Sequence, residues 1–297
     1  MLKLSIIIVS FNTRQLTLNC LESIKKTTGF KDVEVIVVDN ASTDKSVEAI
    51  KDQFPQVKIL RNSINTGFAK ANNQGIKVAS GEYIMLLNSD TLVKPEALLR
   101  LVEFMDAHPR AGILAPQLLN PNGSIQPNGG FLPRLSNIIA WMLFIDDLPF
   151  IKPWFWSYQL RGSSHFIQTR SLGWVQGAAL VLRHSLIDQI GGLDENIFMY
   201  AEDVEICYRA RKSGWQVMLL PQAQIVHLGF KSGSSQKAIL GEYGGLKYIF
   251  KKHKPAWEMP LLRLFLKLGS LLRIVVFGTI TPDKQKYATY KTALTLA

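Results

Sequence analysis

The first 115 residues of the chain alternate short apolar runs with longer segments whose apolar residues recur at helical spacing. The runs are continuously apolar, as in SIIIV, which is typical of strands covered on both faces of a sheet. This alternation predicts an α/β fold with a mostly parallel central sheet and helices on both faces. The predicted strands are Leu4–Val9, Val33–Val38, Val57–Leu60, Tyr83–Leu87 and Gly112–Ala115. The predicted helices are Leu16–Lys26, Lys45–Gln53, Ala69–Ala79 and Pro95–Ala107.

Residues 116–172 break this pattern, because they are rich in Pro, Gly and Asn and carry several large aromatic side chains. We interpret them as a long, irregular, apolar insert. Its aromatic residues include Trp141, Phe144, Phe150, Trp154, Phe155 and Trp156. Strand signals return at Trp174–Leu182, Trp215–Leu220 and Ile225–Leu228, and helix signals at Ser185–Ile190 and Glu202–Lys212. A chain of 297 residues suits one large α/β domain with an appendage, or two small domains.

The last part of the chain, from Gly229 to Ala297, is strongly basic. It holds ten lysines and two arginines against three acidic residues, so +9 of the net charge of +11 lies there. Such a segment suits an anionic surface, either a membrane or a nucleic acid. Because the segment also has a large apolar content, we expect a membrane partner and no nucleic acid.

One stretch of this tail, Leu261–Phe277, has the pattern of a partly amphipathic helix. Arg263, Lys267 and Ser270 follow one another at helical spacing, Arg273 is nearby, and apolar residues fill the rest. The pattern predicts either a helix that lies in a membrane interface or a helix that packs on the main domain, and both alternatives stay open. The sequence contains no run of about 20 uncharged apolar residues, so no transmembrane helix is expected.

Polar residues follow three of the predicted strands, at Ser10–Asn12, Asp39–Asp44 and Asn88–Asp90. One such turn alone could merely cap the next helix, as Ser42 and Asp44 could do for theirs. In an open parallel sheet, however, ligands bind beyond the carboxyl ends of the strands, so three such turns predict one crevice. No G-x-G-x-x-G follows the first strand and no P-loop motif occurs, which excludes two other nucleotide-binding folds.

Asp39 has the chemistry to recognise a nucleobase. Its carboxylate can accept a hydrogen bond from the imide N–H of uracil or thymine, although it cannot choose between the two bases. The residues around Ser10 and Asn12 could frame the ribose and the base. The alternative is that Asp39 is only an Asx-turn residue.

Asn88, Ser89 and Asp90 place one carboxylate beside two neutral oxygen donors. One Asp, water and two oxygens of a nucleotide diphosphate can complete a shell for Mg²⁺ or Mn²⁺, which would stabilise charge on the departing diphosphate. His227, near the end of a late strand, could add a nitrogen ligand and so favour Mn²⁺. A lone His is more often structural, and this alternative also stays open.

Glu202 and Asp203 are adjacent at the start of a predicted helix. The helix dipole would lower their pKa values, whereas their mutual repulsion would raise one of them, and the sequence does not settle this competition. An acceptor hydroxyl needs a base on the face opposite the leaving group, and one carboxylate suffices for single displacement with inversion. We assign Asp203 as the base and Glu202 as a partner that positions the acceptor.

Together these segments resemble the family 2 glycosyltransferases with the GT-A fold, especially the subgroup that includes bacterial rhamnosyltransferases. The resemblance covers residues 4 to 229, and the motifs in this order are far more specific than any one of them. The matching segments are SIIIVSFN (5–12), VIVVDNASTD (35–44), NTGFAKANNQG (65–75), YIMLLNSD (83–90), QGAALVLR (176–183), GGLDENIFMYAEDVEICYRARKSGW (191–215) and IVHLG (225–229).

The resemblance implies a role for each matching position. The nucleoside would face Ser10, Asn12, Asp39 and Asn40, and the donor site would be shaped by Asn65, Gly67, Phe68 and Asn72. Many relatives carry Asp-x-Asp where this chain has Asn88–Ser89–Asp90, so Asp90 must carry most of the metal binding.

On the acceptor side, the resemblance implies that Gly177 and Ala178 line the site, to which we also assign Glu202. Asp203 matches the catalytic base of the family, and His227 matches a metal-ligand position of some relatives. Glu205 occupies a position that is often held by Asp, which is a minor departure from the family pattern.

The implied activity is an inverting, metal-dependent glycosyl transfer with Mn²⁺ or Mg²⁺. The first expectation for the donor is dTDP-rhamnose, and UDP-hexoses are the alternative. The acceptor would be a lipid-linked saccharide or a polysaccharide.

Two domains are expected, a catalytic domain at residues 1–229 and a basic helical extension at residues 230–297. The catalytic domain would consist of a nucleotide-sugar-binding half (1–115) and an acceptor-binding half that contains the aromatic insert (116–229).

The expected location is the cytoplasmic face of the cell membrane, as a peripheral protein. The two cysteines, Cys20 and Cys207, form no disulfide framework, which favours a reducing compartment.

The sequence supports two other functions less well. Nucleotidyl transfer would want a Gly-rich loop with Arg and Lys after the first strand, which SFNTRQL is not, and a non-catalytic nucleotide-sugar-binding module would not need both Asp90 and Asp203.

Overall fold

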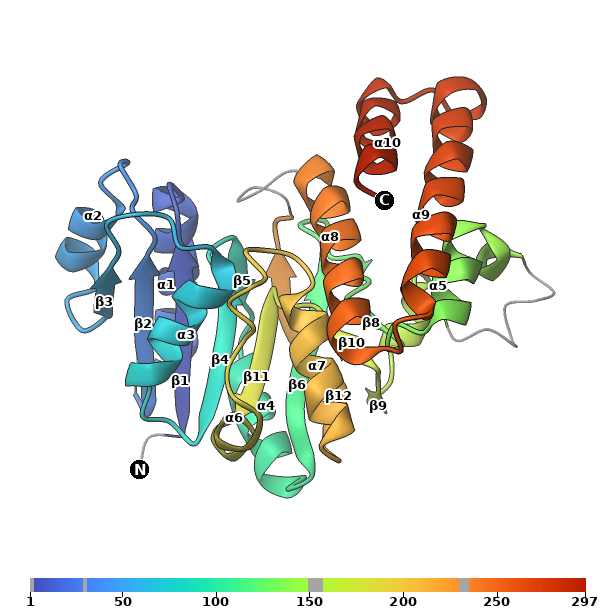
Figure 1. Cartoon of the computed structure of the whole chain (residues 1–297). Helices are drawn as coiled ribbons and strands as arrows, with labels where there is room; N and C mark the ends of the chain where they lie inside the picture. Colours follow the sequence, from blue (N-terminus) through green and yellow to red (C-terminus); the bar gives the residue numbers. More distant parts are fainter. Residues whose placement is uncertain (1–2, 29–30, 149–156, 230–234) are drawn as a thin grey trace. The chain divides into compact units, whose positions relative to one another are not determined.

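The computed structural model describes residues 3–28, 31–148, 157–229 and 235–297 (Figure 1). Its internal contacts divide the chain into two compact units. The sheet unit comprises Met1–Gly129 and Arg161–Ser232, and the helical unit comprises Gly130–Leu160 and Gly233–Ala297. The segment from Gly130 to Leu160 therefore groups with the C-terminal tail, whereas the sequence-based division kept it with residues 116–229.

In the described part of the sheet unit, ten strands form one mixed sheet. They are β1 (Leu4–Ser10), β2 (Val33–Asp39), β3 (Lys58–Arg61), β4 (Tyr83–Asn88), β5 (Thr91–Val93), β6 (Ala111–Leu119), β7 (Ile125–Gln126), β9 (Arg170–Ser171), β11 (Ala179–Arg183) and β12 (Gln216–His227). The order across the sheet is β3-β2-β1-β4-β11-β6-β12-β5, with β7 beside β6 and β9 beside β12. Two short strands, β8 (Gly129–Gly130) and β10 (Trp174–Val175), lie outside this sheet.

β1 lies between β2 and β4 and is parallel to both. Ser10 is in register with Asp39, and Val9 with Asn88, so the carboxyl ends of the three strands meet at one edge of the sheet. β11 runs antiparallel to β4, and Ala179 pairs with Leu87. The residues that precede β11 therefore reach the same edge, which brings the predicted acceptor side next to the end of β4.

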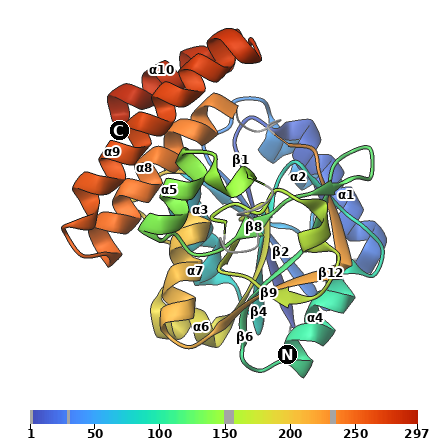
Figure 2. The ribbon, with the colours of Figure 1, turned by 90° about the vertical axis from the view of Figure 1, so that its right-hand side faces the viewer.

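Helices cover both faces of the sheet, as the sequence predicted. The helices of this unit are α1 (Arg14–Thr28), α2 (Ser46–Gln53), α3 (Phe68–Val78), α4 (Ala97–Ala107), α6 (His184–Ile190) and α7 (Glu202–Lys212), with a 3-10 turn at Ser163–Phe166. Apolar residues of α1, α2 and α4 join one core with Leu4, Ile6 and Ile8. α3 packs on the opposite face, where Gly75 lies directly against Ile7. Figure 2 shows α3, α6 and α7 on the other side of the strands from α1 and α4.

Two strand predictions differ from the structure. The single strand predicted at Trp174–Leu182 is two strands, because β10 pairs with β8 outside the main sheet and β11 joins the main sheet only from Ala179. Between them, Gly177 donates a hydrogen bond to Asp203 of α7. The strands predicted at residues 215–220 and 225–228 are one strand, β12, with a register shift between Leu220 and Gln224. Such a shift adds residues to one strand of a pair and interrupts its apolar pattern. The sequence therefore predicted two strands where the structure has one.

Two helix predictions also need correction. The helix predicted from Pro95 begins at Ala97, because Glu96 adopts a left-handed conformation before it. The insert is not wholly irregular, since residues 135–142 form helix α5, which the Pro- and Gly-rich composition around it did not reveal. The insert residues Phe150, Trp154, Phe155 and Trp156 lie outside the described residues.

The helical unit consists of α5 and the tail. Its elements are α5 (Leu135–Met142), a 3-10 turn (Ile145–Asp147), α8 (Ser235–His253), α9 (Glu258–Val275), a π-helical turn (Val276–Ile280) and α10 (Lys284–Leu296). Arg273 of α9 is buried and donates hydrogen bonds to the carbonyl oxygens of Met142 at 2.7 Å and Trp141 at 2.9 Å. α9 is therefore anchored on the C-terminal end of α5 within this unit.

The predicted α/β architecture with a helical C-terminal tail is confirmed. Cys20 and Cys207 are both buried and free. Among the described helices, none combines the length and apolarity that a membrane-spanning segment requires.

Candidate active site

Asn40, directly after β2, holds the loop between β3 and α3 with both ends of its buried amide. Its Nδ2 donates to Asn65 Oδ1 at 2.9 Å and to the Gly67 carbonyl oxygen at 3.3 Å. Its Oδ1 accepts from the backbone N–H of Thr66 at 3.0 Å and from Asn62 Nδ2 at 3.1 Å. The structure thus brings the predicted residues Asn40, Asn65 and Gly67 together. The hydrogen bonds of the Asn40 amide fix the conformation of the 62–67 loop.

Gly67 precedes α3 with φ at +86°, in the left-handed region. A Cβ at this position would lie 2.7 Å from the carbonyl oxygen of Phe198, so both the backbone angle and the space require glycine. The next residue, Phe68, donates its backbone N–H to that same oxygen at 2.7 Å, and Asn72 Nδ2 donates to the Phe68 carbonyl at 3.0 Å. The predicted donor-site residues of α3 are therefore fastened to the loop that leads into α7.

Asp39 is fully buried at the end of β2. Its Oδ2 accepts a hydrogen bond from the backbone N–H of Ser42 at 3.2 Å, so it does stabilise a turn. Its Oδ1 is buried and has no hydrogen-bond partner among the described residues. A buried acceptor without a partner is costly, and a ligand N–H such as that of an imide would satisfy it.

Ser10 and Asn12 connect the turns after β1 and β2 in different ways. The Ser10 hydroxyl is buried and shares hydrogen bonds of 3.1 Å with the hydroxyls of Thr13 and Thr17. The side chain of Ser10 is therefore engaged in the protein interior. Asn12, with φ at 55°, accepts from the backbone N–H of Thr43 at 2.8 Å, which joins the two turns.

Asp90 and His227 lie side by side at the ends of neighbouring segments. His227 Nε2 is 3.5 Å from Asp90 Oδ1, and His227 Nδ1 hydrogen-bonds Gln126 Oε1 at 2.7 Å. Gln126 Nε2 donates to Asn120 Oδ1 at 3.1 Å, so the amide oxygen of Gln126 must face the imidazole ring. Nδ1 therefore carries the proton in the neutral ring, and the lone pair of Nε2 is directed toward the Asp90 carboxylate.

This pair of side chains fits a divalent cation. Ligand bonds of about 2.1 Å set two neighbouring ligand atoms of one ion roughly 3 Å apart, which is close to the observed N–O separation. A carboxylate oxygen with an imidazole nitrogen suits Mn²⁺ better than Mg²⁺. Within residues 3–28, 31–148, 157–229 and 235–297, no cluster of three or more His, Cys, Asp or Glu side chains could hold a metal. Oxygens of a diphosphate, of water or of neutral side chains could supply further ligands.

The residues predicted for the donor side and for the acceptor side meet at the end of β4. The backbone N–H of Asn88 donates to the carbonyl oxygen of Ala178 at 2.9 Å. Ser89, Asp90 and Ala178 are all buried. Gly177, one residue earlier, donates its N–H to Asp203 Oδ2 at 2.8 Å, so the predicted acceptor residues also fix the predicted base.

Glu202 and Asp203 occupy the first turn of α7, and their pKa values are both raised. Burial, together with the negative charge of Asp203, raises the pKa of Glu202 to about 8. Burial also raises the pKa of Asp203, against the opposing hydrogen bonds from the N–H groups of Gly177 and Val204. Burial is thus the largest cause of both raised pKa values, and repulsion by Asp203 adds to it for Glu202.

The backbone before α7 is unusual, because Tyr200 and Ala201 both adopt left-handed conformations, with φ at 70° and 75°. Such conformations of L-residues each cost roughly 1 kcal/mol or more and persist only where the surroundings enforce them. Burial, then the charges of Glu202 and Asp90, raises the pKa of Tyr200. The charges of Asp90 and Glu202 therefore both act on the Tyr200 phenol.

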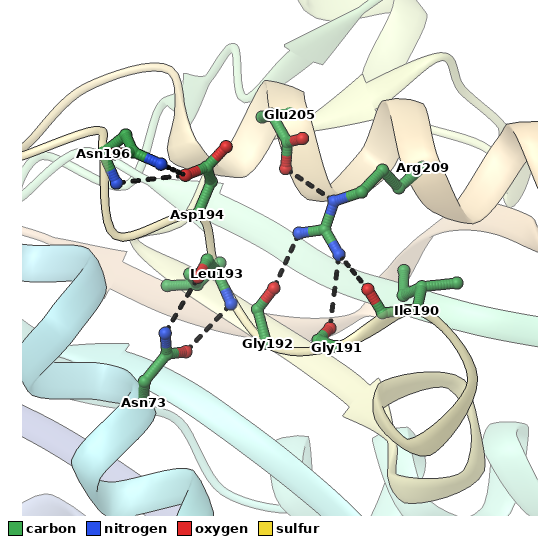
Figure 3. A network of polar contacts seen from close by, with 9 residues as sticks. All are labelled: Asn73, Ile190, Gly191, Gly192, Leu193, Asp194, Asn196, Glu205 and Arg209. Atoms are coloured by element: carbon green, nitrogen blue, oxygen red, sulfur yellow. Dashed lines mark hydrogen bonds and ion pairs between the residues drawn. The ribbon is translucent and has the colours of Figure 1, made fainter. Parts of the chain in front are cut away.

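The loop before these residues is held from two sides, as Figure 3 shows. From α7, Arg209 donates to the carbonyl oxygens of residues 190–192 and pairs with the fully buried Glu205 at 2.7 Å. From α3, Asn73 donates to the carbonyl of Leu193 at 2.8 Å and accepts from its N–H at 2.9 Å. Glu205, which departs from the family pattern, thus serves to orient Arg209.

Four residues of this site were missed by the sequence analysis, and they are Asn73, Gln126, Phe198 and Arg209. Arg209 lies four residues after Glu205, a helical ion-pair spacing that could have revealed it. Gln126 had no such signal, since it lies in a segment interpreted as an irregular insert.

Comparison with known proteins agrees with this geometry. Residues 5–138 match the profile of Glycosyl transferase family 2, and residues 83–242 match that of Glycosyl transferase family group 2. The N-acetylglucosaminyl-diphospho-decaprenol L-rhamnosyltransferase of Mycobacterium tuberculosis is 30% identical over 261 residues, which cover 82% of this chain and 84% of the relative.

Two solved structures have a similar fold. A crystal structure of S. aureus TarS has a TM-score of 0.56 and 19% identity, and the match covers 99% of this chain and 79% of the other. The mannosyltransferase PcManGT from Pyrobaculum calidifontis, in complex with GDP-Man and Mn²⁺, has a TM-score of 0.57 and 16% identity, covering 99% and 84%. The expected GT-A-like fold is thereby confirmed, and the chain is an enzyme that belongs to family 2 of the glycosyltransferases.

Proposed function

We propose that this glycosyltransferase is an inverting, metal-dependent enzyme that transfers rhamnose from dTDP-rhamnose to a lipid-linked saccharide or a polysaccharide. The observation that carries the proposal is the presence of two ionisable pairs. One pair is Asp90 with His227, and the other is Asp203 with Glu202. The hydrogen bonds from Asn88 to Ala178 and from Gly177 to Asp203 link the segments of the two pairs, which supports assigning both pairs to one site. A base and a diphosphate-neutralising centre are the two parts that a single displacement needs.

In this mechanism, Asp203 accepts the proton of the acceptor hydroxyl. Its raised pKa makes it a stronger base than an ordinary Asp, and the Gly177 N–H keeps one carboxylate oxygen fixed. Glu202, whose Oε2 is buried without a hydrogen-bond partner among the described residues, positions the acceptor by hydrogen bonding. In its protonated form Glu202 can donate that bond.

On the donor side, Asp39 receives the imide N–H of the base, and Asn40 holds the 62–67 loop in place. Asp90 and His227 would hold Mn²⁺ or Mg²⁺. When bound, the cation supplies Lewis-acid stabilisation of the negative charge on the departing nucleoside diphosphate. Gly67, Phe68 and Asn72 keep the donor loop against the loop that carries Phe198.

The choice of dTDP-rhamnose rests on similarity to the rhamnosyltransferase of Mycobacterium tuberculosis. That relative is named for an N-acetylglucosaminyl-diphospho-decaprenol acceptor, which supports a lipid-linked acceptor here. With the net charge of +9 in the tail, it also supports a peripheral position on the cytoplasmic face of the cell membrane. UDP-hexoses remain the alternative donors, because Asp39 would accept the imide of uracil equally well.

The test is a thermal-shift panel of dTDP-rhamnose, UDP-glucose, UDP-N-acetylglucosamine and GDP-mannose, each with MnCl₂, MgCl₂ or EDTA. A donor at about 100 times its Kd stabilises the fold by about 2.7 kcal/mol, so dTDP-rhamnose with Mn²⁺ should give the largest shift. The anomeric configuration of the product, read by NMR, tests inversion. A largest shift with a UDP-hexose would favour the alternative donor, and retention or metal-independent turnover would contradict the mechanism.

A further inference from the structure

Helix α9 has one face that the described residues cover and an opposite apolar face that they leave exposed. Its covered face packs within the helical unit through Leu262, Leu266, Gly269, Ser270 and Arg273, all buried. The outer face of α9 consists of six large apolar residues whose side chains are between 38% and 56% exposed. These residues are Leu261, Leu264, Leu268, Leu271, Leu272 and Val275.

This arrangement corrects the amphipathic pattern expected from the sequence. Ser270 and Arg273 were expected on one polar face with Arg263 and Lys267, yet both point inward. The Ser270 hydroxyl hydrogen-bonds the Tyr243 hydroxyl at 2.9 Å, and Arg273 donates to α5. The polar residues of α9 therefore satisfy the interior of the unit, whereas most of its leucines face outward.

Cations flank the outer face along one side. Arg263 and Lys267 are exposed and, with Met259, Pro260 and Leu264, line a surface pocket of about 330 Å³. Lys247 on α8 is close enough that burial, then the Arg263 charge, lowers its pKa. Neighbouring cations beside apolar side chains match the chemistry of an anionic lipid headgroup and its acyl chains.

A second copy of the chain is the other candidate occupant. Residues 261, 264, 268, 271 and 275 alternate by three and four, as in a coiled-coil seam. The positions that flank such a seam, however, are Phe265, Lys267, Leu272 and Ile274, which include no acidic partner for Lys267. Two tails of net charge +9 would also repel each other. Both features favour an anionic partner over self-association.

We propose that the outer face of α9, together with Arg263 and Lys267, lies in the interface of an anionic lipid bilayer. Trp257, which precedes α9 and is 64% exposed, extends this surface at the N-terminal end of the helix. This inference deepens the proposed function. It rests on that function in one respect, because a lipid-linked acceptor requires the enzyme to work at a membrane.

The experiment is flotation of the full chain with vesicles of phosphatidylcholine containing 30% phosphatidylglycerol, or of phosphatidylcholine alone. We expect the wild type to float with the anionic vesicles. Leu264→Gln combined with Leu268→Gln should lower the partition coefficient of the protein between water and vesicles at least about tenfold. The reason is that two apolar side chains which would be buried in the bilayer are replaced by polar ones. Both side chains are exposed, so the circular dichroism spectrum and the thermal midpoint should stay unchanged.

Matched controls come from the sheet unit. Leu99→Gln combined with Ile167→Gln changes two side chains that are 58% and 57% exposed, and flotation should equal that of the wild type. Arg263→Gln combined with Lys267→Gln should lower binding to anionic vesicles several-fold at low salt. Lys51→Gln combined with Lys212→Gln removes the same charge elsewhere and should have a much smaller effect.

Unchanged flotation of the Leu264/Leu268 variant would overturn the inference, whatever its activity. The inference would also be overturned if sedimentation equilibrium showed a wild-type dimer that the Leu264/Leu268 variant dissociates while its vesicle binding stays unchanged. Transfer to a water-soluble acceptor is measured in parallel and should be equal in the variant and the wild type. Absence of such transfer in the wild type would count against the proposed function alone, and flotation would still decide the role of α9.

Discussion

The backbone N–H of Gly177 donates a hydrogen bond of 2.8 Å to Asp203 Oδ2. This contact ties the turn between β10 and β11 to the first turn of α7, two segments that are 26 positions apart in the sequence. A Cβ on Gly177 would lie only 3.3 Å from Asp203 Cβ, so the close approach depends on glycine. The predicted acceptor residue Gly177 and the proposed base Asp203 are therefore positioned as one structural element.

Replacement of the base should abolish most of the activity. Asp203→Asn keeps an oxygen that can accept from Gly177 but removes the basic carboxylate, and kcat should fall by about 10²–10⁴-fold. Donor binding with Mn²⁺, measured by calorimetry, should change little. Asp188→Asn, at an exposed position on α6, serves as the matched control and should retain full activity. Near-normal kcat in Asp203→Asn would assign the base elsewhere.

Gln126 should control metal affinity through the orientation of His227. Gln126→Leu removes the acceptor of the Nδ1 proton, so Mn²⁺ binding in the presence of a nucleoside diphosphate should weaken about 10–100-fold. Titration of free Mn²⁺ by electron paramagnetic resonance measures this without turnover. Gln126→Glu retains an oxygen acceptor and should restore most of the affinity. Equal affinities of the Leu variant and the wild type would show that the ring needs no such support.

The buried pair of Arg209 and Glu205 should matter more for stability than an exposed pair. Arg209→Met leaves the Glu205 charge buried without its partner, and the free energy of unfolding should fall by about 3–5 kcal/mol in urea titrations. Adding Glu205→Gln to this variant should recover part of the loss, because the uncompensated charge is gone. Arg211→Met, at an exposed position on the same helix, should cost less than about 1 kcal/mol.

Stability should depend on pH through Glu202. Its folded-state pKa is raised from 4.5 to about 8, so the native protein binds a proton more tightly than the unfolded chain. The stabilisation is fully present below the ordinary Glu pKa and is lost as the pH rises toward 8, by up to about 1.4 kcal/mol per pH unit.

Glu202→Gln imitates the protonated side chain and should flatten this dependence. Urea titrations at pH 5, 6.5 and 8 should therefore show a stability difference that grows in favour of the variant as the pH rises. Glu103→Gln, at an exposed position on α4, should run parallel to the wild type. Parallel curves for Glu202→Gln as well would mean that burial of Glu202 does not raise its pKa.

The placement of the site at one edge of the sheet was predictable, because continuous apolar runs indicate parallel strands whose carboxyl ends coincide. The contacts inside the site were not. The sequence placed Ser10 at a strand end but did not indicate that its hydroxyl hydrogen-bonds Thr13 and Thr17. Gln126 supports His227 from across 101 positions of sequence, a partnership that no local pattern records.

The amino-acid sequence by itself determined the main strand–helix alternation of the first 115 residues, the polar strand ends and the basic tail, since these follow from local apolar periodicity and charge. Only the tertiary structure decided that Glu202 is buried, which raises its pKa. It also decided that Arg273 turns inward while Leu264 and Leu268 turn outward on α9. The physical reason is that hydration and partner choice depend on neighbours brought together by folding, which the spacing of residues along one helix does not contain.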